Sequence, residues 1–351
     1  MNPLPPNVAS LRPYQSARSL RKGNGWIFMD ANESPLEVAA PIAPPLNRYP
    51  DPTADALRDA VAEYYGVRRG NLMMANGSDE LIDLLVRCFV RSGRKTAAST
   101  PSYGMYRIAA DSAGADFVAA RLRADFSVDE NSLRAVLDNA DLLFICSPNN
   151  PTGTVVPREL IERLSAAFSG LIVVDEAYGE FADAEGVPSS IELVRRGAEN
   201  VVVLRTFSKA FAAAGIRLGY CVANERIINI LLRMKPPYNV NVLTQAAGLA
   251  LWRRRDAMER NVRDLIAARK VLAGGCERLG CSVFPGRANF FLLRPPKGIS
   301  AQTLHESLVE NYRIVVRRFP NVPEMEDLLR VSVGTPEHNE LFLSSLARLL
   351  P

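Results

Sequence analysis

Histidine is scarce in this chain of 351 residues, which contains it only at positions 305 and 338. Zinc sites in proteins draw most of their ligands from clusters of histidine and cysteine, so we expect no metal site. The five cysteines are also dispersed, and no two of them form a Cys-x-x-Cys pair. Such a distribution is typical of free thiols in a reducing compartment and does not indicate a disulfide framework.

Long apolar runs and a strong net charge are absent as well. No stretch approaches the roughly 20 apolar residues that a membrane-spanning helix needs, and the first residues lack the apolar centre of a signal peptide. The net charge of +4 is too small to indicate a nucleic-acid partner. With 48% hydrophobic and 23% charged residues, the chain has the composition of a globular protein, which we expect to work in the cytoplasm without membrane or nucleic acid.

Lysine is the third scarce residue, because most of the positive charge is arginine. Lysines occur at positions 22, 95, 209, 235, 270 and 297. Lys209 stands apart, since it follows an apolar run at 201–204 and precedes three alanines at 212–214. An ammonium group in apolar company is costly unless it is paired or loses its charge, and a lysine that forms a Schiff base escapes that cost. A surface lysine after a strand is the alternative that this stretch alone leaves open.

Strand and helix patterns alternate through the first two thirds of the chain. Short apolar strands are predicted at 72–75, 95–99, 116–120, 142–146, 171–174 and 201–204. Helices are predicted at 54–65, 80–90, 132–139, 158–168 and 190–195, followed by a long helical region at 244–278. This alternation predicts an α/β fold with a largely parallel sheet covered on both faces. Residues 281–351 mix short strands with two helices and read as an α+β unit.

Polar residues follow three successive predicted strands. These residues are Asn150, Asp175 and the pair Ser208-Lys209. In open α/β sheets ligands bind beyond the carboxyl ends of the strands, so we expect these side chains to converge on one ligand. The turn Gly77-Ser78-Asp79 joins another strand to a helix, and the exposed N–H groups there suit an anion. An ordinary N-capped helix is the alternative for that turn.

Several segments occur in an order that resembles a known family. They are PYQSAR (13–18), RYPDP (48–52), NGSDE (76–80), PSYGMY (101–106), SPNNPTG (147–153), DEAY (175–178), TFSKAF (206–211), AGIRLGY (214–220), ANFFLLR (288–294) and LRVSVGT (329–335). The set resembles the fold-type I aminotransferases of classes I and II, which depend on pyridoxal 5′-phosphate (PLP). The resemblance implies a large domain at 41–245 with a mostly parallel seven-stranded sheet. It also implies a smaller α+β domain built from both termini, with an N-terminal arm at 1–40 and residues 246–351.

The resemblance assigns roles around the cofactor ring. Lys209 is the Schiff-base lysine and the base that moves the substrate proton. Asp175 pairs with the ring nitrogen, which keeps the ring an electron sink. Asn150 and Tyr178 bind the phenolic oxygen, and Tyr103 stacks on the ring face.

The resemblance also assigns a phosphate site to the cofactor. Arg217 offers a charge-assisted fork, Ser208 a hydroxyl, and the turn of Gly77, Ser78 and Asp79 its N–H groups. Thr206 is a weaker candidate. Tyr49 matches the family tyrosine that reaches the phosphate from the neighbouring subunit, which implies a homodimer.

Substrate binding is expected on the smaller domain. The resemblance assigns the substrate carboxylate to Arg330, for which a structural ion pair is the alternative. It assigns a substrate phosphate to Arg317 with Tyr14, and places Asn32 and Asn289 near the substrate. The implied reaction is a ping-pong transamination between L-histidinol phosphate and 2-oxoglutarate, with glutamate as the second amino acid, in histidine biosynthesis.

Three other readings stay open at this point. Relatives of this family transaminate aromatic amino acids or decarboxylate phosphothreonine, and Tyr14 with Arg317 favours a phosphorylated substrate over the aromatic one. A regulator that only binds PLP carries a helix-turn-helix unit ahead of such a domain. The recognised segments begin at Pro13, which leaves no room for such a unit, so we expect an enzyme and not a regulator.

Overall fold

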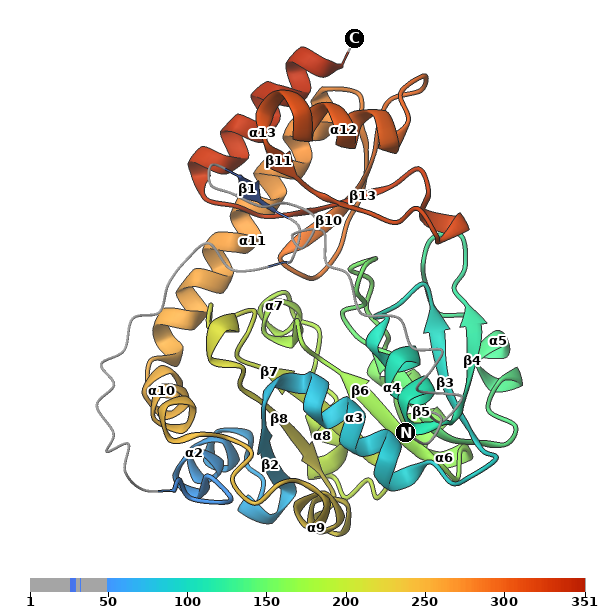
Figure 1. Cartoon of the computed structure of the whole chain (residues 1–351), viewed down its shortest axis with the longest axis vertical. Helices are drawn as coiled ribbons and strands as arrows, with labels where there is room; N and C mark the ends of the chain where they lie inside the picture. Colours follow the sequence, from blue (N-terminus) through green and yellow to red (C-terminus); the bar gives the residue numbers. More distant parts are fainter. Residues whose placement is uncertain (1–25, 30–31, 33–48, 351) are drawn as a thin grey trace, which may run out of the picture.

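A seven-stranded sheet forms the centre of the chain (Figure 1). The structure is a computed structural model that describes residues 26–29, 32 and 49–350. The strand order is β2-β8-β7-β6-β5-β3-β4. The bounds are β2 (Leu72–Ala75), β3 (Lys95–Thr100), β4 (Asp116–Arg121), β5 (Ala140–Cys146), β6 (Leu171–Asp175), β7 (Val201–Thr206) and β8 (Gly219–Ala223). The pairs from β4 to β7 are parallel, and β8 runs antiparallel to both of its neighbours, which confirms the predicted fold class.

The central strands β5, β6 and β7 are buried along their whole length because helices cover both faces of the sheet. Along β7, Val201 and Val203 pack into one buried cluster, and Val202 and Leu204 into another. This alternation follows from the two-residue period of a strand. The first cluster includes residues of α2 (Asp55–Tyr65), α6 (Arg158–Ala167), α8 (Ile191–Arg195) and α10 (Val242–Trp252). The second includes α3 (Gly77–Phe89), α4 (Met105–Ala113) and α9 (Glu225–Met234).

Strand β8 was not predicted, and it brings distant turns together. Its first residue, Gly219, lies opposite Ala75 at the end of β2 and opposite Thr206 at the end of β7. A methyl group at Gly219 would lie 2.7 Å from the carbonyl carbon of Gly77 and 2.8 Å from the nitrogen of Ser78. The close approach of these backbones therefore requires glycine at position 219.

The long helical region predicted at 244–278 is two helices. α10 ends at Trp252, and α11 (Arg255–Arg278) begins after a turn. The buried Trp252 ring stacks on Phe211, and its indole N–H donates to the carbonyl of Ala60 at 3.0 Å. This anchor holds α10 on the sheet layer, while α11 leads away to the C-terminal part (Figure 1).

The C-terminal part is an antiparallel sheet covered by helices. The strand order is β12-β13-β10-β9. The bounds are β9 (Ser282–Phe284), β10 (Phe290–Arg294), β12 (Arg317–Arg318), β13 (Leu329–Ser332), α12 (Ala301–Tyr312) and α13 (Pro336–Leu349). The short strand β1 (Ile27–Phe28) pairs in parallel with β11 (Ile314–Val315), so residues near both termini meet in this part. The domain boundaries near 40 and 245 stay predictions.

Three short helices complete the described chain. They are α5 (Glu130–Ala135), α7 (Gly179–Ala184) and the already named α8. α7 begins directly after Tyr178, so it fixes the position of that side chain beyond β6. In the described residues, none of the helices is both long and apolar enough for a bilayer crossing.

The approach at Gly219 generates a prediction. Gly219→Ala should lower the free energy of unfolding by about 1–3 kcal/mol, because the added methyl group meets backbone atoms that must shift. Gly215→Ala is the matched control, since nothing lies within 4 Å of a methyl group there. Urea unfolding of both variants measures the difference, and equal stabilities would contradict the predicted overlap.

Candidate active site

A cavity of about 740 Å³ opens beyond the carboxyl ends of β5, β6 and β7. Its lining includes most of the predicted site residues: Asn32, Ser78, Asp79, Tyr103, Asn150, Asp175, Tyr178, Thr206, Ser208, Lys209, Arg217, Arg317 and Arg330. Gly77 adjoins the lining, whereas Tyr49 and Asn289 lie outside it. Tyr14 falls outside the described residues. The three strand ends therefore converge as the sequence predicted.

Asp175 is a buried carboxylate at the base of the cavity. Tyr106 donates its hydroxyl to Oδ2 of Asp175 at 2.8 Å, and the Ala177 N–H donates to Oδ1 at 3.1 Å. Burial outweighs these bonds and raises the pKa of Asp175 to about 6. A carboxylate in this position is stabilised by a cation beside it. The side chain therefore suits a protonated ring nitrogen.

Tyr106 is a site residue that the sequence analysis missed. It lies on α4, where its ring stacks on Phe144 with a centroid separation of 4.4 Å. Burial raises its pKa well above the usual value, so the hydroxyl stays protonated and donates to Asp175. The only signal in the sequence is the second tyrosine of PSYGMY. Nothing in that segment pairs it with a carboxylate 69 residues further along.

Tyr178 and Lys209 lie close together in the cavity lining. The Lys209 ammonium nitrogen lies 5.7 Å from the centroid of the Tyr178 ring. Asn32 donates its side-chain amide to the Tyr178 hydroxyl oxygen at 2.9 Å, so that hydroxyl can donate its own proton elsewhere. Burial raises the pKa of Tyr178 to about 12, which keeps it a neutral donor.

The first turn of α3 forms an anion site with Arg217. One guanidinium nitrogen of Arg217 would lie 2.8 Å from a methyl group at Gly77, and another is 3.4 Å from the Ser208 hydroxyl. Arg217 also pairs with Asp79 at 3.4 Å. The N–H groups and positive dipole end of this 13-residue helix face the same place. These donors together suit a phosphate.

Thr206 and Tyr103 form hydrogen bonds to residues of this site. The Ser208 N–H donates to the Thr206 hydroxyl oxygen at 3.1 Å, and that hydroxyl lies 3.0 Å from the Ser208 hydroxyl. Thr206 therefore orients Ser208. The Tyr103 hydroxyl donates to Asp79 at 3.0 Å, and burial raises the pKa of Tyr103. Its ring remains along the cavity wall.

Two arginines from the C-terminal part line the cavity side by side. Arg317 on β12 lies directly opposite Arg330 on β13 in the antiparallel register. Like charges in that arrangement repel each other unless an anion lies between them or near them. Arg330 is largely buried and donates to the side-chain oxygen of Asn150 at 2.5 Å. This bond turns the amide nitrogen of Asn150 away from Arg330.

Asn32 and Asn289 connect the cavity to the C-terminal sheet. Ser332 donates its hydroxyl to the side-chain oxygen of Asn32 at 2.6 Å, and Asn289 donates to its carbonyl at 3.0 Å. Asn32 itself adopts a left-handed backbone conformation with φ of 55°. Asn289 therefore contacts Asn32 and does not line the cavity, and its predicted contact with substrate stays a prediction.

The chemistry of these donors fits PLP. A buried carboxylate suits the cationic ring nitrogen, a neutral tyrosine hydroxyl suits the phenolic oxygen, and a lysine suits the aldehyde. The site formed by α3, Ser208 and Arg217 suits the phosphate. No residue in the set conflicts with this ligand.

Comparisons with known proteins agree with this geometry. A model of the family described as aminotransferase class I and II matches residues 29–346. The chain is 38% identical over 351 residues to a histidinol-phosphate aminotransferase of Parabacteroides distasonis, covering 98% of this chain and 97% of the relative. The solved histidinol-phosphate aminotransferase of Sinorhizobium meliloti in complex with pyridoxal-5′-phosphate has a TM-score of 0.89 at 23% identity, covering 99% and 98%. An L-threonine-O-3-phosphate decarboxylase of Porphyromonas gingivalis has a TM-score of 0.75 at 25% identity, covering 87% and 91%.

The buried carboxylate generates a pH prediction for the cofactor-free protein. The folded pKa of Asp175, about 6, lies above the usual 3.8. Its contribution to stability is therefore fully present below about pH 4 and is lost as the pH rises through about 6. Relative to Asp175→Asn, the native protein should lose roughly 2 kcal/mol of unfolding free energy between about pH 4.5 and about pH 7.5.

Urea unfolding of both proteins at several pH values measures this difference. Other titrating groups are common to the pair and cancel. The exposed Asp138, changed to Asn, is the control that should run parallel to the native protein. Parallel profiles for Asp175→Asn as well would contradict the raised pKa.

Proposed function

The chain belongs to the aminotransferase class I and II family, and from this premise we propose the reaction that it catalyses. It transfers the amino group of L-histidinol phosphate to 2-oxoglutarate, forming imidazole-acetol phosphate and L-glutamate in a ping-pong cycle of histidine biosynthesis. Relatives named histidinol-phosphate aminotransferase are 35–38% identical to this chain over nearly its whole length, which supports the proposal. PLP is the cofactor.

The observation that carries the substrate class is the cross-strand pair of Arg317 and Arg330 in the cavity wall. Two guanidinium groups in register form a positively charged stretch of the cavity wall, which suits an anionic ligand. A phosphate monoester and a carboxylate are the anions that arginine binds best. Histidinol phosphate supplies the first and glutamate the second, so one pair of side chains serves both halves of the cycle.

PLP, when bound, supplies an electron sink for the carbon that exchanges its amino group. Asp175 holds the ring nitrogen in its protonated form, and Tyr106 holds Asp175. Tyr178 and Asn150 donate to the phenolic oxygen. Asn32 accounts for the orientation of Tyr178, and Arg330 for that of Asn150. Tyr103 covers the ring face.

Lys209 would hold the cofactor aldehyde, and its amine would carry the proton of the reacting carbon. Its ammonium lies near the Tyr178 ring and above the end of β7, within the same cavity as both arginines. A single amine can therefore serve the removal of the proton and its return.

The active unit is a homodimer in which Tyr49 contributes to the cofactor phosphate of the other subunit. Tyr49 is 81% exposed and lies outside the cavity of its own chain, which supports a contact with a second copy. We place the enzyme in the cytoplasm, where the five described free thiols are stable. The large and small domains divide near residue 245.

Replacing the proposed covalent lysine tests the chemistry. Lys209→Ala should lower turnover by at least about 1,000-fold, because both the covalent link and the proton carrier are lost. The visible absorbance of the bound cofactor should shift at the same time. Lys297→Ala, at an exposed turn, is the matched control. Retained turnover or an unchanged absorbance band in Lys209→Ala would contradict the proposed mechanism.

A substrate panel tests the phosphate preference. Arg317→Met should raise the KM for histidinol phosphate about 10- to 100-fold, because a charge-assisted contact to phosphate is lost. The KM for phenylalanine should hardly change. Arg318→Met is the control, since the next residue of β12 points to the other face and does not line the cavity.

The native enzyme is assayed on histidinol phosphate, phenylalanine, tyrosine and phosphothreonine in the same panel. Transamination of histidinol phosphate should be fastest. Equal or faster rates on phenylalanine would favour the aromatic aminotransferase reading, and carbon dioxide release from phosphothreonine would favour the decarboxylase reading.

A further inference from the structure

Tyr49 stacks on Tyr238 at the protein surface. The ring centroids lie 4.6 Å apart with an interplanar angle of 14°. The exposed fractions of the two residues are 81% and 45%, so little else packs against the pair. The contacts that position the pair therefore lie mainly in the backbone segments beneath the rings.

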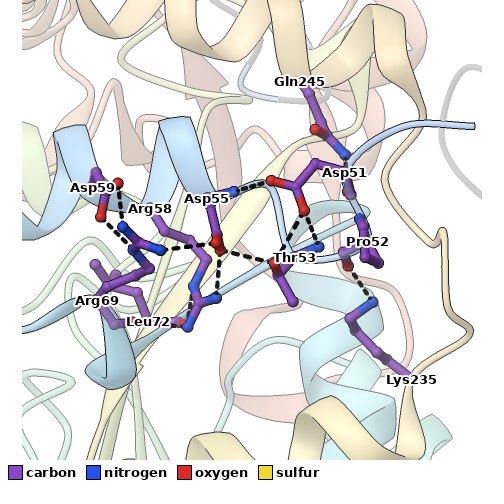
Figure 2. Close-up of polar contacts among 10 residues, drawn as sticks. All are labelled: Asp51, Pro52, Thr53, Asp55, Arg58, Asp59, Arg69, Leu72, Lys235 and Gln245. Carbon is purple, nitrogen blue, oxygen red and sulfur yellow. Dashed lines mark hydrogen bonds and ion pairs between the residues drawn. The ribbon is translucent and has the colours of Figure 1, made fainter.

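Lys235 connects the two backbone segments that carry these rings. Its ammonium donates to the carbonyl of Pro52 at 2.7 Å (Figure 2). It also donates to the carbonyls of Pro236 at 3.1 Å and Pro237 at 2.9 Å. Three protons thus meet three acceptors, and the side chain is only 8% exposed. Prolines lack the N–H with which other segments pair, so the ammonium supplies the donors that join these turns.

Further bonds brace the segment of Tyr49 against α2 and α10. Gln245 donates to the carbonyl of Asp51 at 2.8 Å (Figure 2). The Asp51 carboxylate accepts the N–H of Thr53 at 2.9 Å and that of Asp55 at 2.7 Å, at the start of α2. These hydrogen bonds therefore fix the short segment between Tyr49 and the start of α2.

The segment of Tyr238 is braced against the start of α3. Asn76 donates its side-chain amide to the carbonyl of Asn239 at 2.6 Å, and Asn239 donates to Glu80 at 3.0 Å. Residues 235–239 thus contact the helix whose first turn forms the anion site. Lys235 therefore links the segment of Tyr49 to the segment that contacts α3.

We propose that Lys235 is a positioning residue, whose ammonium holds Tyr49 in the conformation that binds the cofactor phosphate of a second copy of this chain. This inference rests on the proposed function, because it needs the homodimer in which Tyr49 reaches the other site. Lys235 is not among the residues that line the cavity. It acts through the carbonyls of Pro52 and Pro237, which lie three residues after Tyr49 and one before Tyr238.

A double-mutant cycle on full-length protein tests the proposal. PLP is removed and added back to the native protein, Tyr49→Phe, Lys235→Met and the double variant, and its dissociation constant is measured. Tyr49→Phe keeps the ring and loses the hydroxyl, so PLP affinity should fall about tenfold. Lys235→Met should cost a similar factor in the presence of Tyr49, and less than about twofold in the Tyr49→Phe background.

Pyridoxal, which lacks the phosphate, provides the second arm of the same experiment. Tyr49 acts on the phosphate alone, so Lys235→Met should leave pyridoxal binding unchanged within about twofold. Lys235→Arg keeps a charged donor and should recover most of the PLP affinity. Lys297→Met, an exposed lysine next to a proline as Lys235 is, is the matched control and should bind PLP like the native protein.

The outcomes separate the two claims. If Tyr49→Phe leaves PLP affinity unchanged, the proposed contact between subunits fails, and this inference fails with it. If Tyr49→Phe weakens PLP binding but the two losses multiply, or pyridoxal binding falls as well, Lys235 is only structural and the proposal is overturned. Should Lys235→Met yield no folded protein, Gln245→Leu is taken through the same cycle, and multiplying losses there overturn the proposal equally.

Discussion

The buried carboxylate of Asp175 is the interaction on which the site depends. Desolvation at the end of β6 makes its charged form costly, and the hydroxyl of Tyr106 offsets only part of that cost. A cationic ring nitrogen removes the conflict. Parallel neighbours of β6 carry Asn150 and Lys209 to the same edge of the sheet, so a ligand held at Asp175 lies within reach of both. A cationic ring would thus offset the electrostatic cost that the fold imposes by burying this carboxylate.

The C-terminal part completes the cavity through a few polar contacts. Arg330 binds Asn150, and Asn32 joins Tyr178 to Ser332. These bonds connect Tyr178 and Asn150 to β13, the strand that carries Arg330 and Ser332. The side chains predicted to bind the cofactor and those predicted to bind the substrate are therefore in direct contact.

Much of the fold could be predicted from the sequence because its strands are buried on both faces. Apolar, β-branched runs such as Val201 to Leu204 are unambiguous when no polar residue interrupts them. Two of the features that were not predicted have a clear physical reason. Strand β8 follows too closely on the loop after Lys209 to stand out, and the long helical pattern conceals the turn between α10 and α11. That turn depends on the anchoring of Trp252 against Ala60, a contact between residues 192 positions apart.

The sequence by itself determined the family and the three polar strand ends, and it predicted the cofactor lysine, because each depends on a local pattern or on an ordered set of segments. Tertiary structure alone decided which side chains act through others. The bond from Tyr106 to Asp175, the register of Arg317 with Arg330, and the anchoring of the Tyr49 segment by Lys235 join residues far apart in the chain. Hydrogen bonds and charge repulsion depend on distances of a few ångströms, and only the packed sheets and helices set those distances.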